Sequence, residues 1–223
     1  MNLKTYPDRE FMMIGVADQI ASALATALRT EDRVTLAVPG GGTPGPVFDI
    51  LSGLDLDWAR VSVVLTDERW VPDCAPRSNA RLVRERLLRG TAVAATFVPL
   101  YAEAPAPEDR LDDLAAAIAP HLPITVLLLG MGADLHIASL FPGADRLAEA
   151  LAADAPVLMA LRADAAGEPR VTLTAPVLAD AMHIHVLITG PEKRAALDRA
   201  ADLPLEQAPI RAVLKNATIH WAE

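Results

Sequence analysis

The hydrophobic positions of the chain follow two alternating spacings along most of its length. Helical spacing predicts a long first helix over residues 8–29. Short, continuous apolar runs predict buried strands at 34–38, 61–65, 124–130 and 183–190. The same criteria predict helices at 46–52, 78–89, 108–119 and 191–200, and strands at 155–161, 170–174 and 217–221. Ser78 is expected to cap one helix and Pro176 to begin another, short one.

This order of elements predicts an α/β fold with a Rossmann-like, mostly parallel sheet and helices on both faces. Strands such as 61–65 (VSVVL) are apolar at every position, as expected where both faces of a sheet are buried. No repeat or long linker divides the chain, so residues 1–223 are expected to form a single domain. In such sheets, ligands bind beyond the carboxyl ends of the strands, and the residues that follow each strand are therefore the candidates for chemistry.

Composition narrows the classes of function. The 223 residues include 20 basic and 29 acidic side chains, a net charge of −9, and only 4% aromatic residues, which argues against a nucleic-acid-binding surface. Mean hydropathy is +0.27, yet no apolar run approaches the roughly 18 residues of a membrane span. The first residues lack a secretion signal pattern and Cys74 is the single cysteine, so we expect a cytoplasmic protein without membrane association or an intrachain disulfide.

A glycine run follows the strand at 34–38. Gly41, Gly42 and Thr43 lie in the segment PGGGTPG, where backbone N–H groups, the Thr43 hydroxyl and the start of the next helix are able to surround a phosphate. An ordinary tight turn between a strand and a helix explains the run equally well. No Gly-Lys-Ser/Thr follows, so the segment is not a Walker loop.

Charged side chains follow the strand at 61–65. Asp67 and Glu68 precede Arg69 and Trp70, which is the type of cluster that supplies an acid, a base or an orienting group. The competing interpretation is a surface ion pair beside a buried tryptophan.

An aspartate and a histidine follow the strand at 124–130. Asp134 and His136 lie two residues apart in a glycine-bounded loop, where a carboxylate fixes the tautomer of an imidazole base. We expect structural roles for the other four histidines, since His183 and His185 alternate on a strand without a convincing third metal ligand. The remaining two are His121 and His220. Cys74 has no neighbouring base and is expected to be inert.

Two cations complete the set of candidates. Arg170 begins the strand at 170–174, and Lys193 lies where the helix at 191–200 begins. Each is unremarkable alone, but both are placed to hold a phosphate dianion if they share a sheet edge with the glycine run.

These segments together resemble the 6-phosphogluconolactonase family, within the wider glucosamine-6-phosphate isomerase/deaminase-like group. The resemblance covers nearly the whole chain, through VPGGGTPGPVFDIL, LTDERWVP, SNARLVRERLL, LLLGMGADLHIASLFPG, RVTLTAPVL and ITGPEKRAAL in that order. It implies a Rossmann-like fold and hydrolysis of 6-phospho-D-glucono-1,5-lactone in the oxidative pentose phosphate pathway. It implies no metal or organic cofactor, and a phosphorylated sugar lactone as the ligand. We expect a monomer or a small homo-oligomer.

The resemblance also assigns roles to individual residues. His136 is implied as the catalytic base, with Asp134 orienting it. Asp67 is implied as a further catalytic residue that lines the pocket together with Arg69. The residues implied to bind the substrate are Gly41, Gly42, Thr43, Arg69, Arg170 and Lys193.

The loop that carries His136 departs from the family pattern Asp-Gly-His-Thr-Ala-Ser. Leu135 replaces the glycine and Ile137 replaces the threonine. If this glycine adopts a positive φ, a leucine there is strained by roughly 1–2 kcal/mol or the loop moves and displaces His136. This keeps open a catalytically weakened sugar-phosphate-binding protein. An amino-sugar-phosphate isomerase/deaminase is less favoured, because residues 138–142 lack the glutamate that those enzymes carry.

Overall fold

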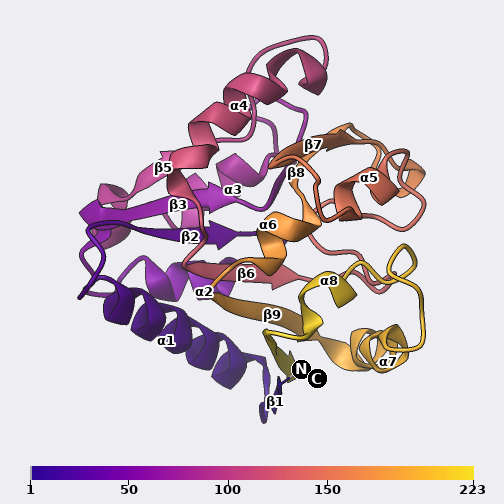
Figure 1. The fold of residues 1–223 in the computed structure, drawn as a ribbon. Coiled ribbons are helices and arrows are strands. Elements are labelled where there is room, and N and C mark those ends of the chain that lie inside the picture. The colour runs from indigo at the N-terminus through magenta and orange to yellow at the C-terminus, as the bar shows by residue number, and fades with distance from the viewer. Residues whose placement is uncertain (1) are drawn as a thin grey trace.

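A seven-stranded parallel sheet forms the centre of the computed structural model, which describes residues 2–223. Its strand order is β1-β10-β9-β6-β2-β3-β5, and all six pairings are parallel (Figure 1). The strands are β1 (Asn2–Thr5), β2 (Val34–Val38), β3 (Val61–Leu65), β5 (Thr96–Val98), β6 (Val126–Gly130), β9 (His183–Thr189) and β10 (Ala217–Ala222). The predicted α/β fold with a parallel sheet is confirmed.

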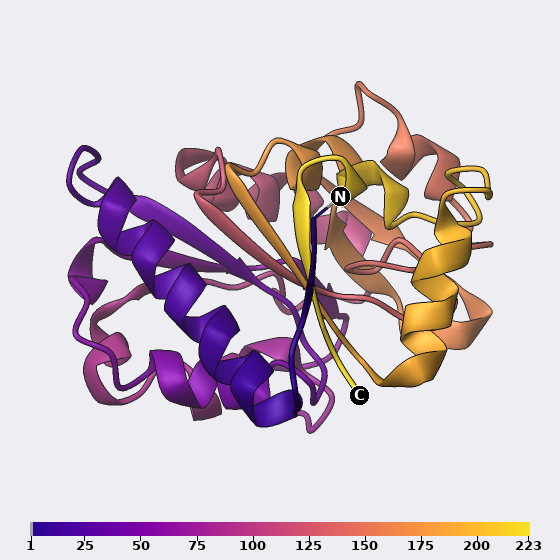
Figure 2. The same cartoon turned by 90° about the horizontal axis from the view of Figure 1, so that it is seen from below.

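Helices cover both faces of this sheet. Figure 2 shows the indigo α1 (Arg9–Ala27) and the yellow α8 (Arg211–Leu214) on opposite sides of the strands. The other helices are α2 (Gly45–Leu51), α3 (Asn79–Arg86), α4 (Leu111–Ile118), α5 (Leu147–Leu151), α6 (Ala175–Ala179) and α7 (Gly190–Ala200). Every residue of β2 and β3 is buried, which explains why their sequences are continuously apolar. Within residues 2–223, no helix combines the length and the apolar character needed to cross a bilayer.

A second, three-stranded antiparallel sheet accompanies the first. It contains β4 (Asp67–Arg69), β7 (Leu158–Leu161) and β8 (Arg170–Leu173), in the order β4-β8-β7. The apolar pattern predicts β7 and β8 but not β4, since the sequence Asp-Glu-Arg carries no strand signal. Pairing with β8 makes this segment a strand, and it sets Asp67 opposite Thr172 and Arg69 opposite Arg170.

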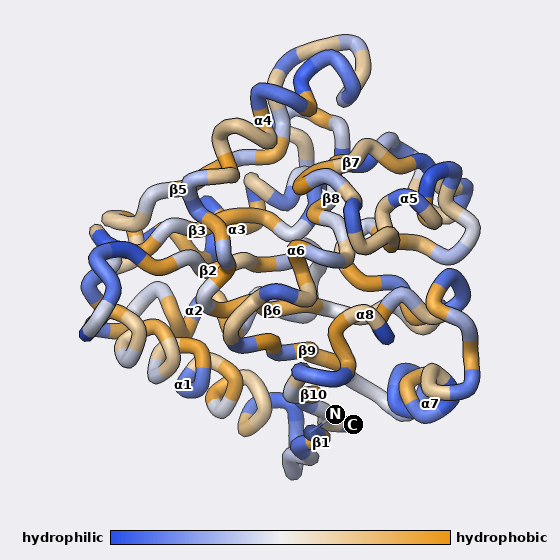
Figure 3. Tube along the Cα trace, viewed as in Figure 1, coloured by the Kyte–Doolittle hydropathy of each residue, from blue (hydrophilic) through white to orange (hydrophobic). Residues whose placement is uncertain are grey.

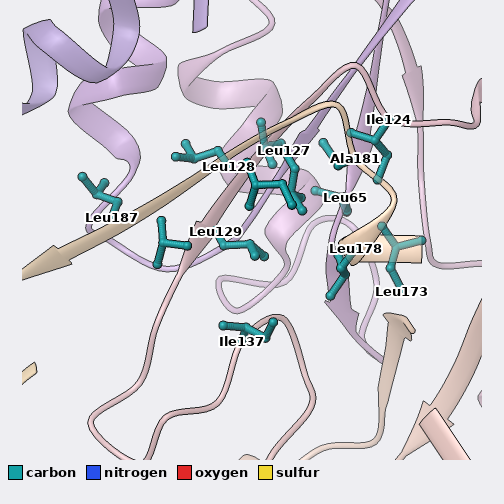
Figure 4. Close-up of a cluster of buried hydrophobic side chains, with 14 of the residues drawn as sticks. Leu65, Ile124, Leu127, Leu128, Leu129, Ile137, Leu173, Leu178, Ala181 and Leu187 are labelled. Atoms are coloured by element: carbon teal, nitrogen blue, oxygen red, sulfur yellow. The ribbon is translucent and has the colours of Figure 1, made fainter. Parts of the chain in front are cut away.

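One hydrophobic cluster joins the two sheets. Figure 4 shows leucines of β6 beside Leu65 of β3 and Leu173 of β8, with Ile137 from the loop after β6 in the same cluster. Hydrophobic residues predominate in β3 and β9, whereas hydrophilic ones predominate in α7 on the surface (Figure 3). The second sheet is therefore fixed against the carboxyl end of the first by shared core contacts.

Local signals set several helix starts as predicted. Ser78 caps α3 by accepting a hydrogen bond from the backbone N–H of Arg81 at 3.2 Å, and Asp8 caps α1 in the same way. Pro176 and Pro191 occupy the first turns of α6 and α7, where the missing N–H has no cost.

Candidate active site

A cavity of about 330 Å³ lies at the carboxyl ends of β2, β3, β6 and β9, where β4 and β8 also reach it. The predicted site residues that line it are Gly41, Thr43, Asp67, Arg69, His136, Arg170 and Lys193. Two predicted residues do not. Asp134 contacts His136 without lining the cavity, and Gly42 lines a neighbouring cavity between α1 and α2. Most of the residues that the strand-end rule singles out therefore line one cavity.

His136 and Asp134 form a hydrogen-bonded pair. Nδ1 of His136 lies 2.6 Å from Oδ1 of Asp134, and the same oxygen lies 3.3 Å from the backbone N–H of His136. The hydrogen bond from His136 lowers the pKa of Asp134 below its ordinary value, despite partial burial. Because an ionised carboxylate only accepts, it assigns the proton of the neutral imidazole to Nδ1 and leaves Nε2 as the basic nitrogen.

The backbone of this loop brings the pair together. A Cβ on Gly132 would collide with both Nδ1 of His136 and Oδ1 of Asp134, so any other residue there would push this pair of side chains out of its observed position. Leu135 has a φ of +69°, a left-handed conformation that a glycine adopts without strain. Leu135 accepts this conformation with its side chain buried and its carbonyl held by the N–H of Ile210 at 3.1 Å. With Leu135 in this conformation His136 still contacts Asp134, and Ile137 replaces a threonine hydroxyl with core contacts.

Arg170 is a buried cation at the cavity wall. It comes from the second sheet rather than from the edge of the parallel sheet, which corrects the expectation that it shares that edge with Lys193. Its Nη2 donates to the carbonyl of Ala166 at 2.8 Å, while its Nε has no partner among residues 2–223. Burial lowers its pKa below the ordinary value. Nη1 lies 3.9 Å from Asp67 Oδ2, beyond hydrogen-bond distance, so the guanidinium keeps donor capacity for an anion in the cavity that it lines.

Phe141 lies between the base and the cation. Its ring centroid is 4.2 Å from that of His136, and the Arg170 guanidinium carbon lies 5.6 Å from it on the ring face. Sequence reasoning did not single out Phe141, because an isolated phenylalanine is usually a core residue. Phe141 follows His136 by five positions, and the path of the loop between them brings the two rings into contact.

Asp67 is a buried carboxylate with a saturated set of partners. Ser139 Oγ donates to its Oδ2 at 2.6 Å and Thr66 Oγ1 donates to its Oδ1 at 3.1 Å. Arg170 Nη1 lies 3.9 Å from Oδ2. The Asp67 carbonyl accepts from the side-chain amide of Asn79 at 2.8 Å, and Asn79 itself lines the cavity. These contacts favour an orienting role over proton transfer.

Glu68 is fully buried and serves the backbone instead of the cavity. Its carboxylate accepts hydrogen bonds of 2.8 Å from the N–H groups of Arg69, Asn79 and Ala80, and one of 3.0 Å from Ser78 Oγ. Burial raises the pKa of Glu68, and these hydrogen bonds oppose the rise. Glu68 therefore fixes α3 to β4. Because both carboxylates are buried, the interpretation of this segment as a surface ion pair is wrong.

Arg69 and Lys193 complete the cationic lining. Arg69 donates to the carbonyl of Arg77, and Arg77 pairs with Glu168 through an Nε–Oε1 contact of 2.6 Å and an Nη2–Oε2 contact of 2.8 Å. This bridge connects the loop before α3 to the loop between β7 and β8, whose Ala165 lines the cavity. Burial lowers the pKa of Lys193, although the charges of Glu192 and Asp134 oppose that shift.

The other histidines do not reach the cavity. His220 Nε2 lies 3.0 Å from His185 Nδ1, and its Nδ1 lies 2.9 Å from the Tyr6 hydroxyl, so three side chains from β9, β10 and the end of β1 form a buried polar chain. Burial lowers the pKa of His185 to about 4 and that of His220 to about 3. Cys74 is exposed. Over residues 2–223, no three histidine, cysteine, aspartate or glutamate side chains gather in a way that would hold a metal ion.

Comparisons with known proteins agree with this geometry. Residues 7–221 match the family model described as glucosamine-6-phosphate isomerases/6-phosphogluconolactonase. The chain is 44% identical to a 6-phosphogluconolactonase of Mesorhizobium japonicum, over 99% of this chain and 95% of that protein. It is 40% identical to a 6-phosphogluconolactonase of Rhizobium meliloti, over 99% of this chain and 98% of that protein. The crystal structure of a 6-phosphogluconolactonase from Shewanella baltica superposes with a TM-score of 0.96 at 32% identity, covering 100% and 98% of the two chains.

Proposed function

Since the chain belongs to the glucosamine-6-phosphate isomerases/6-phosphogluconolactonase family, we propose that it hydrolyses 6-phospho-D-glucono-1,5-lactone to 6-phospho-D-gluconate. The observation that carries this proposal is that His136, paired with Asp134, lines the same cavity as Arg170, whose guanidinium makes a single hydrogen bond within residues 2–223. A base and an anion site at one cavity suit a neutral ring ester that carries a phosphate.

The cationic wall supports phosphate as the anchored group. Arg69 and Arg170 face each other directly across the β4–β8 ladder, where two like charges repel unless an anion or a carboxylate compensates them. Asp67 compensates only part of this charge, from 3.9 Å. A phosphate dianion held by both arginines, Lys193, Thr43 and the Gly41 backbone, all of which line the cavity, supplies the rest.

The mechanism assigns each proton to an atom. Nε2 of His136 takes a proton from water while the water oxygen bonds to the lactone carbonyl carbon and the carbonyl electron pair moves to oxygen. The donor to that oxyanion is either Arg69 or a backbone N–H of a glycine loop, whichever the phosphate leaves free. When the oxyanion collapses, the bond to the ring oxygen breaks and His136 returns its proton to that oxygen. Asp134 stabilises the imidazolium that exists between the two steps.

The geometry of the site supports the two alternative functions, a weakened binding protein and a deaminase, less than it supports the lactonase. The weakened binding protein was motivated by Leu135 and Ile137, yet His136 remains on Asp134. The deaminase alternative still lacks a glutamate in residues 138–142. The fold does not discriminate here, because a monomeric glucosamine-6-phosphate deaminase superposes with a TM-score of 0.82 at 16% identity.

The deciding experiment measures turnover of freshly made lactone above its spontaneous hydrolysis, for the wild type and for His136→Gln. We expect the wild type to accelerate hydrolysis and His136→Gln to lose that acceleration while still binding 6-phosphogluconate. Binding without acceleration in the wild type would establish the binding protein instead. Ammonia release from glucosamine 6-phosphate would establish the deaminase.

A further inference from the structure

We propose that Ser139 is a positioning residue, which holds the loop of His136 in register with the phosphate-binding arginines by its hydrogen bond to Asp67. The proposal deepens the function proposed above and rests on it. Ser139 is fully buried and lies three residues after the base. No property of a serine at this position in the sequence suggests such a role.

Ser139 is attached to the second sheet at two points. Its Oγ donates to Asp67 Oδ2 at 2.6 Å, and its backbone N–H donates to Thr172 Oγ1 at 3.2 Å. Asp67 and Thr172 are partners across the β4–β8 ladder. Ser139 therefore contacts both members of a single cross-strand pair, one on each strand.

The arginines of the cavity lie on the same two strands. Arg69 and Arg170 form the cross-strand pair two residues along this ladder from Asp67 and Thr172, so their side chains emerge on the same face of the sheet. Asp67 also lies 3.9 Å from Arg170 through the oxygen that Ser139 contacts. Ser139 is thereby connected to the cationic wall through one buried carboxylate.

The segment between Ser139 and His136 is rigid enough to transmit this attachment. Ile137 is fully buried, Ala138 has a φ of +48° and lines the cavity, and the N–H of Leu140 closes a tight turn on the Ile137 carbonyl at 2.9 Å. A shift of Ser139 consequently moves His136 relative to a phosphate that stays on the arginines. Misplacing a catalytic group by about 1 Å costs on the order of 100-fold in rate.

The first test removes the hydroxyl with Ser139→Ala and measures lactone hydrolysis and binding of 6-phosphogluconate. We expect kcat to fall about 10- to 100-fold, with KM and the product Kd changing less than about 3-fold, because the phosphate ligands remain. Ser139→Thr, which keeps the hydroxyl, is expected to recover most of kcat. The matched control is Ser62→Ala, since Ser62 is also fully buried but its Oγ has no hydrogen-bond partner in residues 2–223.

A double-mutant cycle separates positioning from a general structural effect. If Ser139 acts through Asp67, then Ser139→Ala costs less than about 2-fold in kcat when Asp67→Asn is already present. Losses that multiply, or a kcat for Ser139→Ala within about 2-fold of wild type, would overturn the proposal.

Failure of this proposal is distinguishable from failure of the proposed function. If the wild type does not hydrolyse the lactone, the function fails, and the ring ¹⁵N resonances of His136 still report on Ser139. We expect Ser139→Ala to shift them when phosphate is bound and Ser62→Ala to leave them in place. Unchanged resonances in both variants would refute the positioning role without reference to activity.

Discussion

Asp134 and His136 are joined twice, because one carboxylate oxygen lies 2.6 Å from the imidazole Nδ1 and 3.3 Å from the backbone N–H of the same histidine. The side chain and the backbone of the base are thus oriented by a single atom. This relationship sets which nitrogen faces the cavity.

Asp134→Asn should lower kcat by roughly 100- to 10,000-fold with little change in product binding. An amide is able to donate to Nδ1, which moves the imidazole proton to Nε2 and removes the base. Steady-state kinetics and titration with 6-phosphogluconate test this. Asp154→Asn is the control, because Asp154 is exposed and lies outside the cavity. A kcat within a few-fold of wild type would show that Asp134 does not orient the base.

Lys193→Gln should raise KM about 10-fold or more and change kcat less. The substitution removes one charge-assisted contact, worth about 1.5–3 kcal/mol, from the anchored phosphate. Lys215→Gln is the matched control, since Lys215 is exposed and does not line the cavity. If both variants behave alike, Lys193 is not a phosphate ligand.

The Arg77–Glu168 bridge should contribute to substrate binding through the loop that it holds. Glu168→Gln is expected to raise KM about 2- to 5-fold at low salt, with the difference shrinking as salt screens the pair. Measurement of KM across ionic strength tests this. The control, Glu149→Gln, breaks the exposed Arg146–Glu149 pair and should leave KM unchanged. If Glu168→Gln and the wild type have equal KM values at all ionic strengths, the bridge does not contribute to substrate binding.

At Leu135 we expect a glycine substitution to be less destabilising than an alanine substitution, the reverse of the usual order. Both Leu135→Ala and Leu135→Gly lose buried packing, at a cost of about 3 kcal/mol. At a φ of +69°, however, glycine relieves backbone strain. The free energy of unfolding of Leu135→Gly should therefore be about 1 kcal/mol higher than that of Leu135→Ala, which makes the glycine variant the more stable of the two. At Leu127 in β6 the order should reverse. Chemical denaturation of the four variants decides this, and alanine more stable than glycine at position 135 would contradict it.

The buried histidine pair should make the fold less stable in mild acid. The pKa values of about 4 for His185 and about 3 for His220 lie below the ordinary 6.5. Above pH 6.5 neither state is protonated. Between pH 6.5 and about 4 the unfolded chain takes up protons that the folded chain does not, so stability falls as the pH falls. At pH 5 the loss is about 2 kcal/mol for each histidine.

Denaturation of the wild type, His185→Gln and Tyr6→Phe between pH 7 and 5 tests this linkage. His185→Gln should flatten the dependence of the unfolding free energy on pH by about half. Tyr6→Phe removes a hydrogen bond to His220 without removing a histidine, so it should lower stability while keeping the wild-type slope. A wild-type unfolding free energy that is constant over this range would contradict the linkage.

The sequence predicts the inner strands of the parallel sheet, because strands such as VSVVL and LLLG are buried on both faces and are therefore apolar at almost every position. It does not predict the edge strands β1 and β5, nor β4, whose Asp-Glu-Arg sequence becomes a strand only through pairing with β8. The glycine runs, the histidine and the clusters of charged residues in the sequence predict that His136, Asp67 and the cations belong to the candidate site. Ser139 and Phe141 were beyond reach, since their importance lies in contacts with residues distant in the sequence.

The pairing of β1 with β10 has a consequence for synthesis of the chain. Asn2 is aligned with Thr218, so β1 is synthesised long before β10, its neighbour in the sheet. Until β10 emerges, β1 is unpaired and β9 presents an open edge that other nascent chains are able to join. The β1–β10 contact joins residues that are far apart in the sequence. The entropic cost of forming it is therefore met late in folding. The vulnerable period for aggregation is therefore expected to last until translation of the final strand.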